Sequence, residues 1–243
     1  MKKFIILFLL FSVSIVAVKA QKSGGLLNSV RKAVGGNPGS SLSNDDIVNG
    51  LKQALTIGAQ KSASQLSAVD GFFKDAAVKI LLPEQAQKVE KTLRGLGMGK
   101  MVDDAILSVN RAAEDAAKSA APIFVNAVKN MSIQDALGIL RGSDTSATSY
   151  LKKTTTPELT ASFKPVIDTS LTKTGATKYW RDIFETYNKL PTTFRKVDPD
   201  LSSYVTQKAM IGIFYYVAVE EKKIRKDPAA QVTDILKKVF GGN

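Results

Sequence analysis

The feature that most constrains the fold is an apolar segment near the end of the chain, from Ala209 to Val219. The segment is apolar on all sides, and the charged residues Lys208 and Glu220 bracket it. A helix of this kind is normally surrounded by other helices. Its length is about half of the ~20 residues that a membrane-spanning helix requires. The segment therefore predicts a buried central helix.

The rest of the chain after residue 42 also shows helical spacing of apolar residues, without a useful period-2 strand pattern. Ser43 with Asp45 and Asp46 predicts one helix start, and Ser132 with Asp135 predicts another. We expect a single all-α domain of about eight or nine helices over residues 42–243. The residues expected to divide it are Asp70-Gly71, Pro83, Gly142, Pro157, Gly175, Pro191, Asp198-Pro199 and Asp227-Pro228.

The first residues have the pattern of a secretory signal peptide. Lys2 and Lys3 precede an apolar run from Phe4 to Val18. The sequence Val18-Lys19-Ala20 then has small or aliphatic residues at the positions that a signal peptidase recognises, which predicts cleavage after Ala20. The competing interpretation is a membrane anchor, but the run is shorter than the ~20 residues of a spanning helix. We expect residues 1–20 to be removed on export and residues 21–41, rich in Gly and Ser, to form a flexible leader.

The chain contains no Cys and no His. Disulfides, thiolate chemistry, imidazole catalysis and most zinc or haem sites are therefore excluded. The apolar run is followed by no Cys that could carry a lipid, so we expect a periplasmic or secreted protein that is not a lipoprotein and has no transmembrane span after cleavage. No cofactor motif is present. The glycine-rich stretch 95–100 lacks the preceding strand and the following hydroxyl of a phosphate-binding loop, and predicts an interhelical turn.

The charge balance favours anionic partners. The chain has 34 Lys and Arg against 22 Asp and Glu, a formal charge of +12, which falls by three to +9 when Lys2, Lys3 and Lys19 are removed. The cations are spread along the helices without an aromatic-interleaved cluster or a recognition helix, so no specific nucleic acid is expected. Lipid or another envelope component is the expected partner.

Asn110, Arg111 and Glu114 form the first candidate polar cluster. Asn110 falls on the apolar stripe of its predicted helix, and Arg111 and Glu114 have the i,i+3 spacing of an ion pair. A polar side chain on a packing face needs hydrogen-bond partners. The cluster predicts either a polar site at the base of a cleft or, as the favoured interpretation, a hydrogen-bonded lock between helices.

Glu220, Glu221 and Arg225 form the second candidate cluster. Paired carboxylates suit acid–base chemistry or a divalent cation, but adjacent residues point about 100° apart on a helix. One carboxylate can then face inward while the other faces solvent. The favoured interpretation is a structural ion pair between Glu221 and Arg225 at i,i+4.

Trp180 is the centre of an aromatic helical face that also includes Tyr179, Phe184 and Tyr187. Core packing is the default explanation for such a stripe. The alternative is a platform that contacts a sugar, a lipid or a partner protein.

Several short motifs together resemble bacterial domain-of-unknown-function family 4197, over about Leu42 to Phe240. The motifs lie at 50–55, 70–73, 82–83, 110–114, 147–151, 204–206, 212–214 and 220–228. The resemblance implies an all-α fold and an envelope location, and it supplies no substrate or catalytic residues. Many members look like lipoproteins, and the missing Cys departs from that pattern.

Three functions are compatible with the sequence. The leading hypothesis is a non-enzymatic envelope protein that binds an apolar or amphiphilic ligand or an anionic envelope component. The second is an interaction or assembly factor that docks through the helix around Trp180. A carboxylate-dependent hydrolase is the least favoured alternative, because the usual catalytic machinery is missing.

Overall fold

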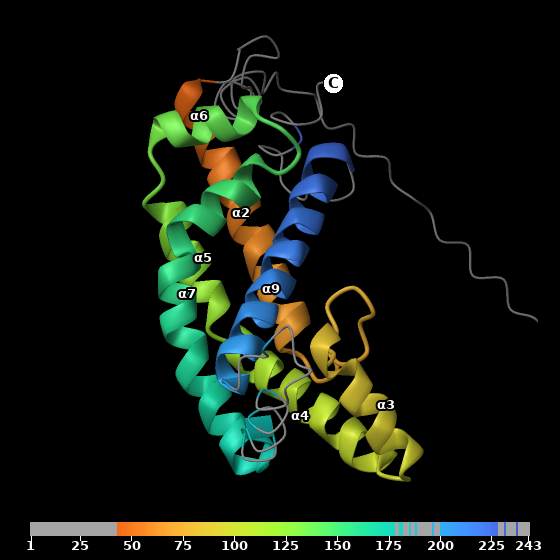
Figure 1. Ribbon diagram of the computed structural model, residues 1–243. Helices are drawn as coiled ribbons and strands as arrows, with labels where there is room; N and C mark the ends of the chain where they lie inside the picture. The colour runs from red at the N-terminus through yellow and green to blue at the C-terminus, as the bar shows by residue number, and fades with distance from the viewer. Residues whose placement is uncertain are drawn as a thin grey trace, which may run out of the picture. The chain divides into compact units, whose positions relative to one another are not determined.

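The computed structural model describes residues 43–177, 180, 181, 185, 188, 196, 200–227, 231 and 237, and these lie in helices, turns or irregular segments, with no strand. The signal-peptide and leader predictions, Pro191 and Asp198-Pro199 lie outside the described residues, and the expected total of helices stays a prediction. The elements are α2 (Asn44–Ser67), the 3₁₀ helix η1 (Glu84–Ala86), α3 (Gln87–Gly95), α4 (Gly99–Ala117), α5 (Ala120–Lys129), α6 (Ile133–Arg141), α7 (Ser146–Lys173) and α9 (Leu201–Lys226) (Figure 1).

Local capping sets several of these boundaries as expected. The Ser43 hydroxyl accepts from the backbone N–H of Asp46, whose carboxylate accepts from the backbone N–H of Ser43. Ser132 and Asp135 make the same reciprocal pair at the start of α6. Each pair satisfies two N–H groups that a helix start leaves free. Both predicted helix starts are confirmed.

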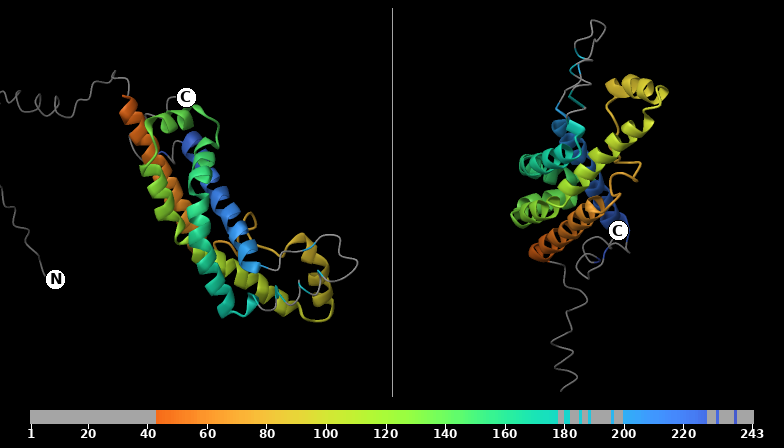
Figure 2. Two further views of the ribbon diagram at one scale, coloured as in Figure 1. Left: turned by 60° about the vertical axis from the view of Figure 1, so that its left-hand side comes forward. Right: turned by 90° about the horizontal axis from the view of Figure 1, so that it is seen from below.

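The helices α2, α5, α7 and α9 pack around a shared apolar core, while α6 packs against α2 and α7 (Figures 1 and 2). Helix α4 contacts α2, α7 and α9. It also forms a hairpin with α3, the helix that precedes it in the chain. The largest fully buried core side chains include those of Leu66, Phe72, Phe124, Phe163 and Ile213. Among the described residues, no helix combines the length and apolar character that crossing a membrane requires.

Helix α9 contains the apolar segment that the sequence singled out. It packs against α2, α4 and α7, and Ala209, Ile213 and Val217 are buried. The prediction that the segment is buried all round is wrong on one side, because Ile211 and Tyr215 are 59% and 46% exposed. The reason is that the packed helices cover α9 from one side and leave a solvent-facing stripe.

The prediction that Pro157 divides two helices is also wrong. Pro157 and Pro165 both lie inside α7. Both are exposed, so the carbonyls that lose a helical N–H partner, at positions 153 and 161, lie on the exposed side of α7, where water can satisfy them. The opposite side is held by a buried row of side chains, which outweighs the local penalty: Leu151, Thr155, Leu159, Phe163, Ile167 and Leu171.

The alanine-rich stretch at the junction of α4 and α5 belongs to the packed core. Ala112, Ala113, Ala116, Ala117 and Ala120 are fully buried. Small side chains let neighbouring helices approach closely and keep the interior densely packed. None of these alanines lines the large cavity described below, so the space they leave is filled by protein.

Candidate functional site

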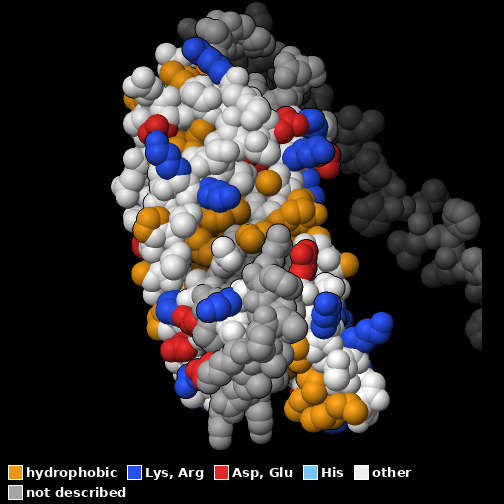
Figure 3. Space-filling model, in the orientation of Figure 1, with side chains coloured by type: hydrophobic (Ala, Val, Ile, Leu, Met, Phe, Trp, Pro, Cys, Tyr) orange, Lys and Arg blue, Asp and Glu red, His pale blue; other side chains and the backbone are white. Residues whose placement is uncertain are grey.

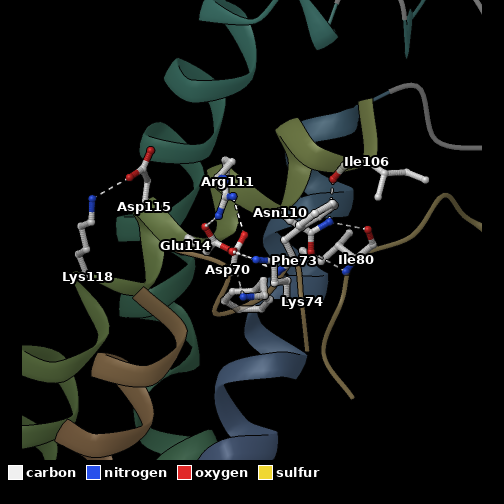
Figure 4. Close-up of polar contacts among 11 residues, drawn as sticks. Asp70, Phe73, Lys74, Ile80, Ile106, Asn110, Arg111, Glu114, Asp115 and Lys118 are labelled. Carbon is white, nitrogen blue, oxygen red and sulfur yellow. Dashed lines mark hydrogen bonds and ion pairs between the residues drawn. The ribbon is translucent and has the colours of Figure 1, made fainter. Parts of the chain in front are cut away.

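Asn110 lies on the buried side of α4 and holds the segment that joins α2 to η1. Its Oδ1 accepts from the backbone N–H of Ile80 at 2.8 Å, and its Nδ2 donates to the carbonyl of Ile80 at 2.8 Å and to that of Ile106 at 2.7 Å (Figure 4). The side chain therefore satisfies both backbone groups of a buried residue outside regular structure. This arrangement matches the lock interpretation.

Glu114, one turn further along α4, holds the turn at residues 70–73. Its Oε1 accepts from the backbone N–H groups of Phe72 and Phe73 at 3.1 and 3.2 Å. Its Oε2 accepts from Arg111 at 2.6 Å, and Arg111 also donates to Asp70 at 2.6 Å (Figure 4). The predicted Arg111–Glu114 ion pair forms, and both carboxylate oxygens of Glu114 accept hydrogen bonds from within the protein.

The turn that Glu114 holds requires glycine. A Cβ on Gly71 would lie 2.4 Å from the backbone carbonyl oxygen of Gln65. Phe72 then enters the core against Gly212 of α9, where a Cβ would lie 2.6 Å from its ring. The motif at 70–73 and the motif at 212–214 are thus two sides of one packing contact.

Two tyrosines of α9 anchor the same segment. The Tyr204 hydroxyl donates to the carbonyl of Leu81 at 2.7 Å, and the Tyr216 hydroxyl donates to Asp75. Burial is the main cause that raises the pKa of each phenol to about 12. Both phenols therefore stay protonated donors at neutral pH.

The carboxylate of Glu221 caps the start of α7. Its Oε1 accepts from the backbone N–H of Ala147 at 3.0 Å, and its Oε2 accepts from the N–H and the hydroxyl of Thr148 at 2.8 Å each. A negative charge at a helix N-terminus is favourable. Residues more than 70 positions apart in the sequence are joined in this way.

Arg225 completes this second cluster. It donates to Oε1 of Glu221 at 2.9 Å, so the predicted ion pair forms, and to the carbonyl of Ile139 at 2.9 Å near the end of α6. Its side chain is only 12% exposed. The Glu221–Arg225 pair therefore ties the last turns of α9 to the end of α6 and the start of α7.

Glu220 pairs with Lys223 at 2.6 Å rather than with Glu221 or Arg225. The expectation that one of the two adjacent glutamates faces solvent is wrong, since both are buried, at 7% and 5% exposed. Glu220 faces α2, with its Cβ 3.4 Å from the position that a Cβ on Gly58 would occupy. In the described part of the chain, no group of three His, Cys, Asp or Glu side chains is placed to hold a metal ion.

A hollow lies elsewhere, between the α3–α4 hairpin and the neighbouring ends of α7 and α9. It has a volume of about 620 Å³. Its wall is mostly apolar and includes Val89 and Leu93 of α3, Met101, Val102 and Ala105 of α4, and Trp180. Volumes of ~300–1,000 Å³ with apolar walls are typical of small-molecule sites.

Helix α3 has an unusual place in this cavity. Its sequence has one apolar side, yet none of its nine residues is buried. Val89 and Leu93 are only half-buried because they border the cavity instead of packed side chains. The helix is held by Arg94, which bonds Glu90 at 2.9 Å and Asp103 of α4 at 2.8 Å. The predicted interhelical turn is confirmed, with Gly97 at a φ of 80°.

Trp180 is the one member of the predicted aromatic face that the structure describes. It is 6% exposed, borders the cavity and stacks on Tyr204 with 5.7 Å between ring centroids. Tyr179, Phe184 and Tyr187 lie outside the described residues. The Trp180 side chain is therefore buried and forms part of the cavity wall. Of the other candidate residues from the sequence, Arg111 alone borders the same cavity.

The charged residues that border the cavity balance one another. They are Glu90, Asp104, Lys100 and Arg111. The hydrogen bond to Asp104 raises the pKa of Lys100, and the bonds to Glu114 and then Asp70 raise that of Arg111. Lys100 and Arg111 therefore stay charged near neutral pH. Two acidic and two basic residues border the cavity, so their formal charges offset one another.

Apart from Arg111, the sequence did not single out the cavity residues of α3 and α4. Val89 and Leu93 repeat at helical spacing like any core stripe. The only hint was the glycine-rich stretch beside them, which separates two helices of a hairpin.

Comparison with known proteins identifies the family of the chain. No curated protein and no solved structure matches it. The family model described as "Protein of unknown function (DUF4197)" matches residues 41–241. This range includes both polar clusters and the cavity, as well as every motif on which the resemblance rested. The chain belongs to the DUF4197 family.

Proposed function

We propose that this protein binds an apolar or amphiphilic small molecule in the cavity between α3 and α4, without catalysing a reaction. The observation that carries the proposal is the hollow of about 620 Å³ beneath a helix with no buried residue. A water-filled apolar cavity of this size is costly, and an apolar ligand would remove its wall from water.

The charges at the cavity suggest which part of the ligand supplies affinity. Because Lys100 and Arg111 are already paired with carboxylates, an anionic headgroup gains little from either of them. The apolar body of the ligand would supply most of the binding free energy, and its polar end would face solvent. This favours an uncharged or weakly polar amphiphile over a strongly anionic one.

The polar clusters support a binding role rather than hydrolysis. Both carboxylate oxygens of Glu114 and of Glu221 already accept hydrogen bonds from backbone N–H groups or from Arg. A general base needs a free lone pair directed at its substrate. We also propose that the protein acts in the bacterial envelope after export, on the basis of residues 1–20.

Binding of N-phenyl-1-naphthylamine, a neutral apolar fluorophore, tests this function. Ala105→Phe fills the cavity from α4, and Ala161→Phe is the matched control on the exposed side of α7. We expect saturable one-to-one binding by the unmodified protein and the control, and at least about tenfold weaker binding by Ala105→Phe. Equal binding by all three proteins would show that the probe uses another surface.

A further inference from the structure

We propose that the solvent-facing side of α9 binds the surface of an anionic lipid bilayer. This side, called the α9 stripe below, consists of Lys208, Ile211, Tyr215 and Lys222. The inference does not depend on the cavity or on its ligand, because none of the four residues borders the cavity.

Spacing and exposure place the four side chains together. The steps from 208 to 211, 215 and 222 are three, four and seven residues, which keep one side of a helix. Lys208 and Lys222 are exposed, and Ile211 and Tyr215 are 59% and 46% exposed. In the orientation of Figure 1, hydrophobic side chains gather where α7 and α9 lie (Figure 3).

A second segment with an exposed apolar residue lies beside one end of the stripe. The Lys208 ammonium lies 5.7 Å from the ring centre of Tyr204, whose hydroxyl donates to the carbonyl of Leu81. The Leu81 side chain is 55% exposed. Leu81, Ile211 and Tyr215 are therefore three exposed apolar side chains in two adjoining segments.

The charge of α9 is strongly one-sided. Its two acids, Glu220 and Glu221, are buried. The exposed charged side chains of the helix are all lysines. Lys223 and Lys226 are paired with Glu220 and Asp144, whereas within the described residues no ion pair occupies Lys208 or Lys222. Two lysines that form no ion pair within the described residues thus flank the exposed Ile and Tyr.

This combination fits a lipid surface better than other polyanions. Anionic headgroups attract each lysine near the surface, and the long lysine side chain keeps its charge in water while apolar neighbours enter the acyl boundary. Tyr suits the same interface because its ring is apolar and its hydroxyl polar. Nucleic acid backbones would use the lysines but leave Ile211 and Leu81 without a partner.

Because the natural chain has no cysteine, an Ile211→Cys variant of the full chain can carry a single environment-sensitive nitrobenzoxadiazole label. Ile133→Cys on α6, where the native side chain is 54% exposed, is the matched control. With vesicles of phosphatidylglycerol and phosphatidylcholine, we expect a blue shift and a severalfold intensity gain at position 211 only. This local readout stays informative even if residues 4–18 also bind the vesicles.

Two further measurements test whether vesicle binding requires the lysine charges and anionic lipid. In the labelled chain, Lys208→Gln with Lys222→Gln should weaken the response at position 211 by about tenfold or more, and pure phosphatidylcholine should give little response. Lys88→Gln with Lys91→Gln, exposed on α3, removes the same charge and should change little. Equal responses at 211 and 133, equal loss in the two double variants, or a response to duplex DNA but not to vesicles would each overturn the proposal.

Discussion

Thr148 donates both its backbone N–H and its hydroxyl to the same oxygen of Glu221, at 2.8 Å each, across 73 positions of sequence. The two residues connect the start of α7 to the last turns of α9. A buried carboxylate with this many donors is an organising element of the fold, which agrees with the structural ion pair that the sequence favoured for Glu221 over acid–base chemistry.

Glu221→Gln should destabilise the protein by about 3 kcal/mol, because it leaves Arg225 partly buried without its counter-ion and turns amide donors toward the N–H groups of α7. Arg225→Met should cost about 1–3 kcal/mol. The double variant should cost clearly less than the sum of the two, since the residues share one contact. Urea unfolding measures all three. Strictly additive losses would show that the pair is not coupled, and Glu158→Gln on the exposed side of α7 is the control.

Asn110→Leu should cost about 2–4 kcal/mol, because the backbone N–H and carbonyl of Ile80 lose their buried partners. Hydrogen exchange of the Ile80 amide should accelerate more than that of core amides in α7, which distinguishes local release from global loss. Asn126→Leu, at an exposed position of α5, should leave both unchanged. Normal protection of Ile80 in Asn110→Leu would contradict the lock.

Gly71→Ala and Gly138→Ala should change stability in opposite directions. The added methyl at 71 meets backbone at 2.4 Å, whereas at 138, inside α6, nothing lies within 4 Å. We expect a loss of at least about 2 kcal/mol at 71 and a gain of about 0.5–1 kcal/mol at 138, where alanine is the better helix former. Thermal unfolding compares the two, and a tolerated Gly71→Ala would mean that the turn is not held against α2.

Stability should depend on Asp200 in a defined pH range. Asp200 caps α9, and hydrogen bonds from Ser203 and then Lys164 lower its pKa from 3.8 to about 2. A lowered folded-state pKa stabilises the protein above about pH 4, and this contribution disappears as the pH falls toward 2. The carboxylate is 46% exposed, so screening reduces the effect to about 0.5–1 kcal/mol. Asp200→Asn should differ from the unmodified protein by that amount at pH 7 and by almost nothing at pH 2.

Local rules explain which parts of the fold the sequence predicted well. The capping pairs at Ser43 and Ser132 join residues three apart, and the Arg111–Glu114 and Glu221–Arg225 pairs join residues three or four apart. Such spacings follow from helix geometry alone. Pro157 was misjudged because the buried row along α7 is a tertiary contribution that outweighs one missing N–H.

The candidate site depended on contacts that spacing does not encode. The partners of Glu114 are Phe72 and Phe73, more than 40 positions away. The solvent-facing Ile211 could not be told from its buried neighbour Ile213 inside an apolar run. The cavity was missed for the same reason, since Val89 and Leu93 look like core residues until the position of α3 is known.

The most direct test of the central claim is native mass spectrometry of the gently purified protein, incubated with a panel of fatty alcohols, monoacylglycerols and fatty acids. The account predicts a one-to-one adduct with the unmodified protein and with Ala161→Phe, strongest for the uncharged amphiphiles. It predicts loss of that adduct in Ala105→Phe, whose added ring occupies the cavity wall at α4. No adduct with any member of the panel, or the same adduct in Ala105→Phe, would contradict a ligand-binding cavity between α3 and α4.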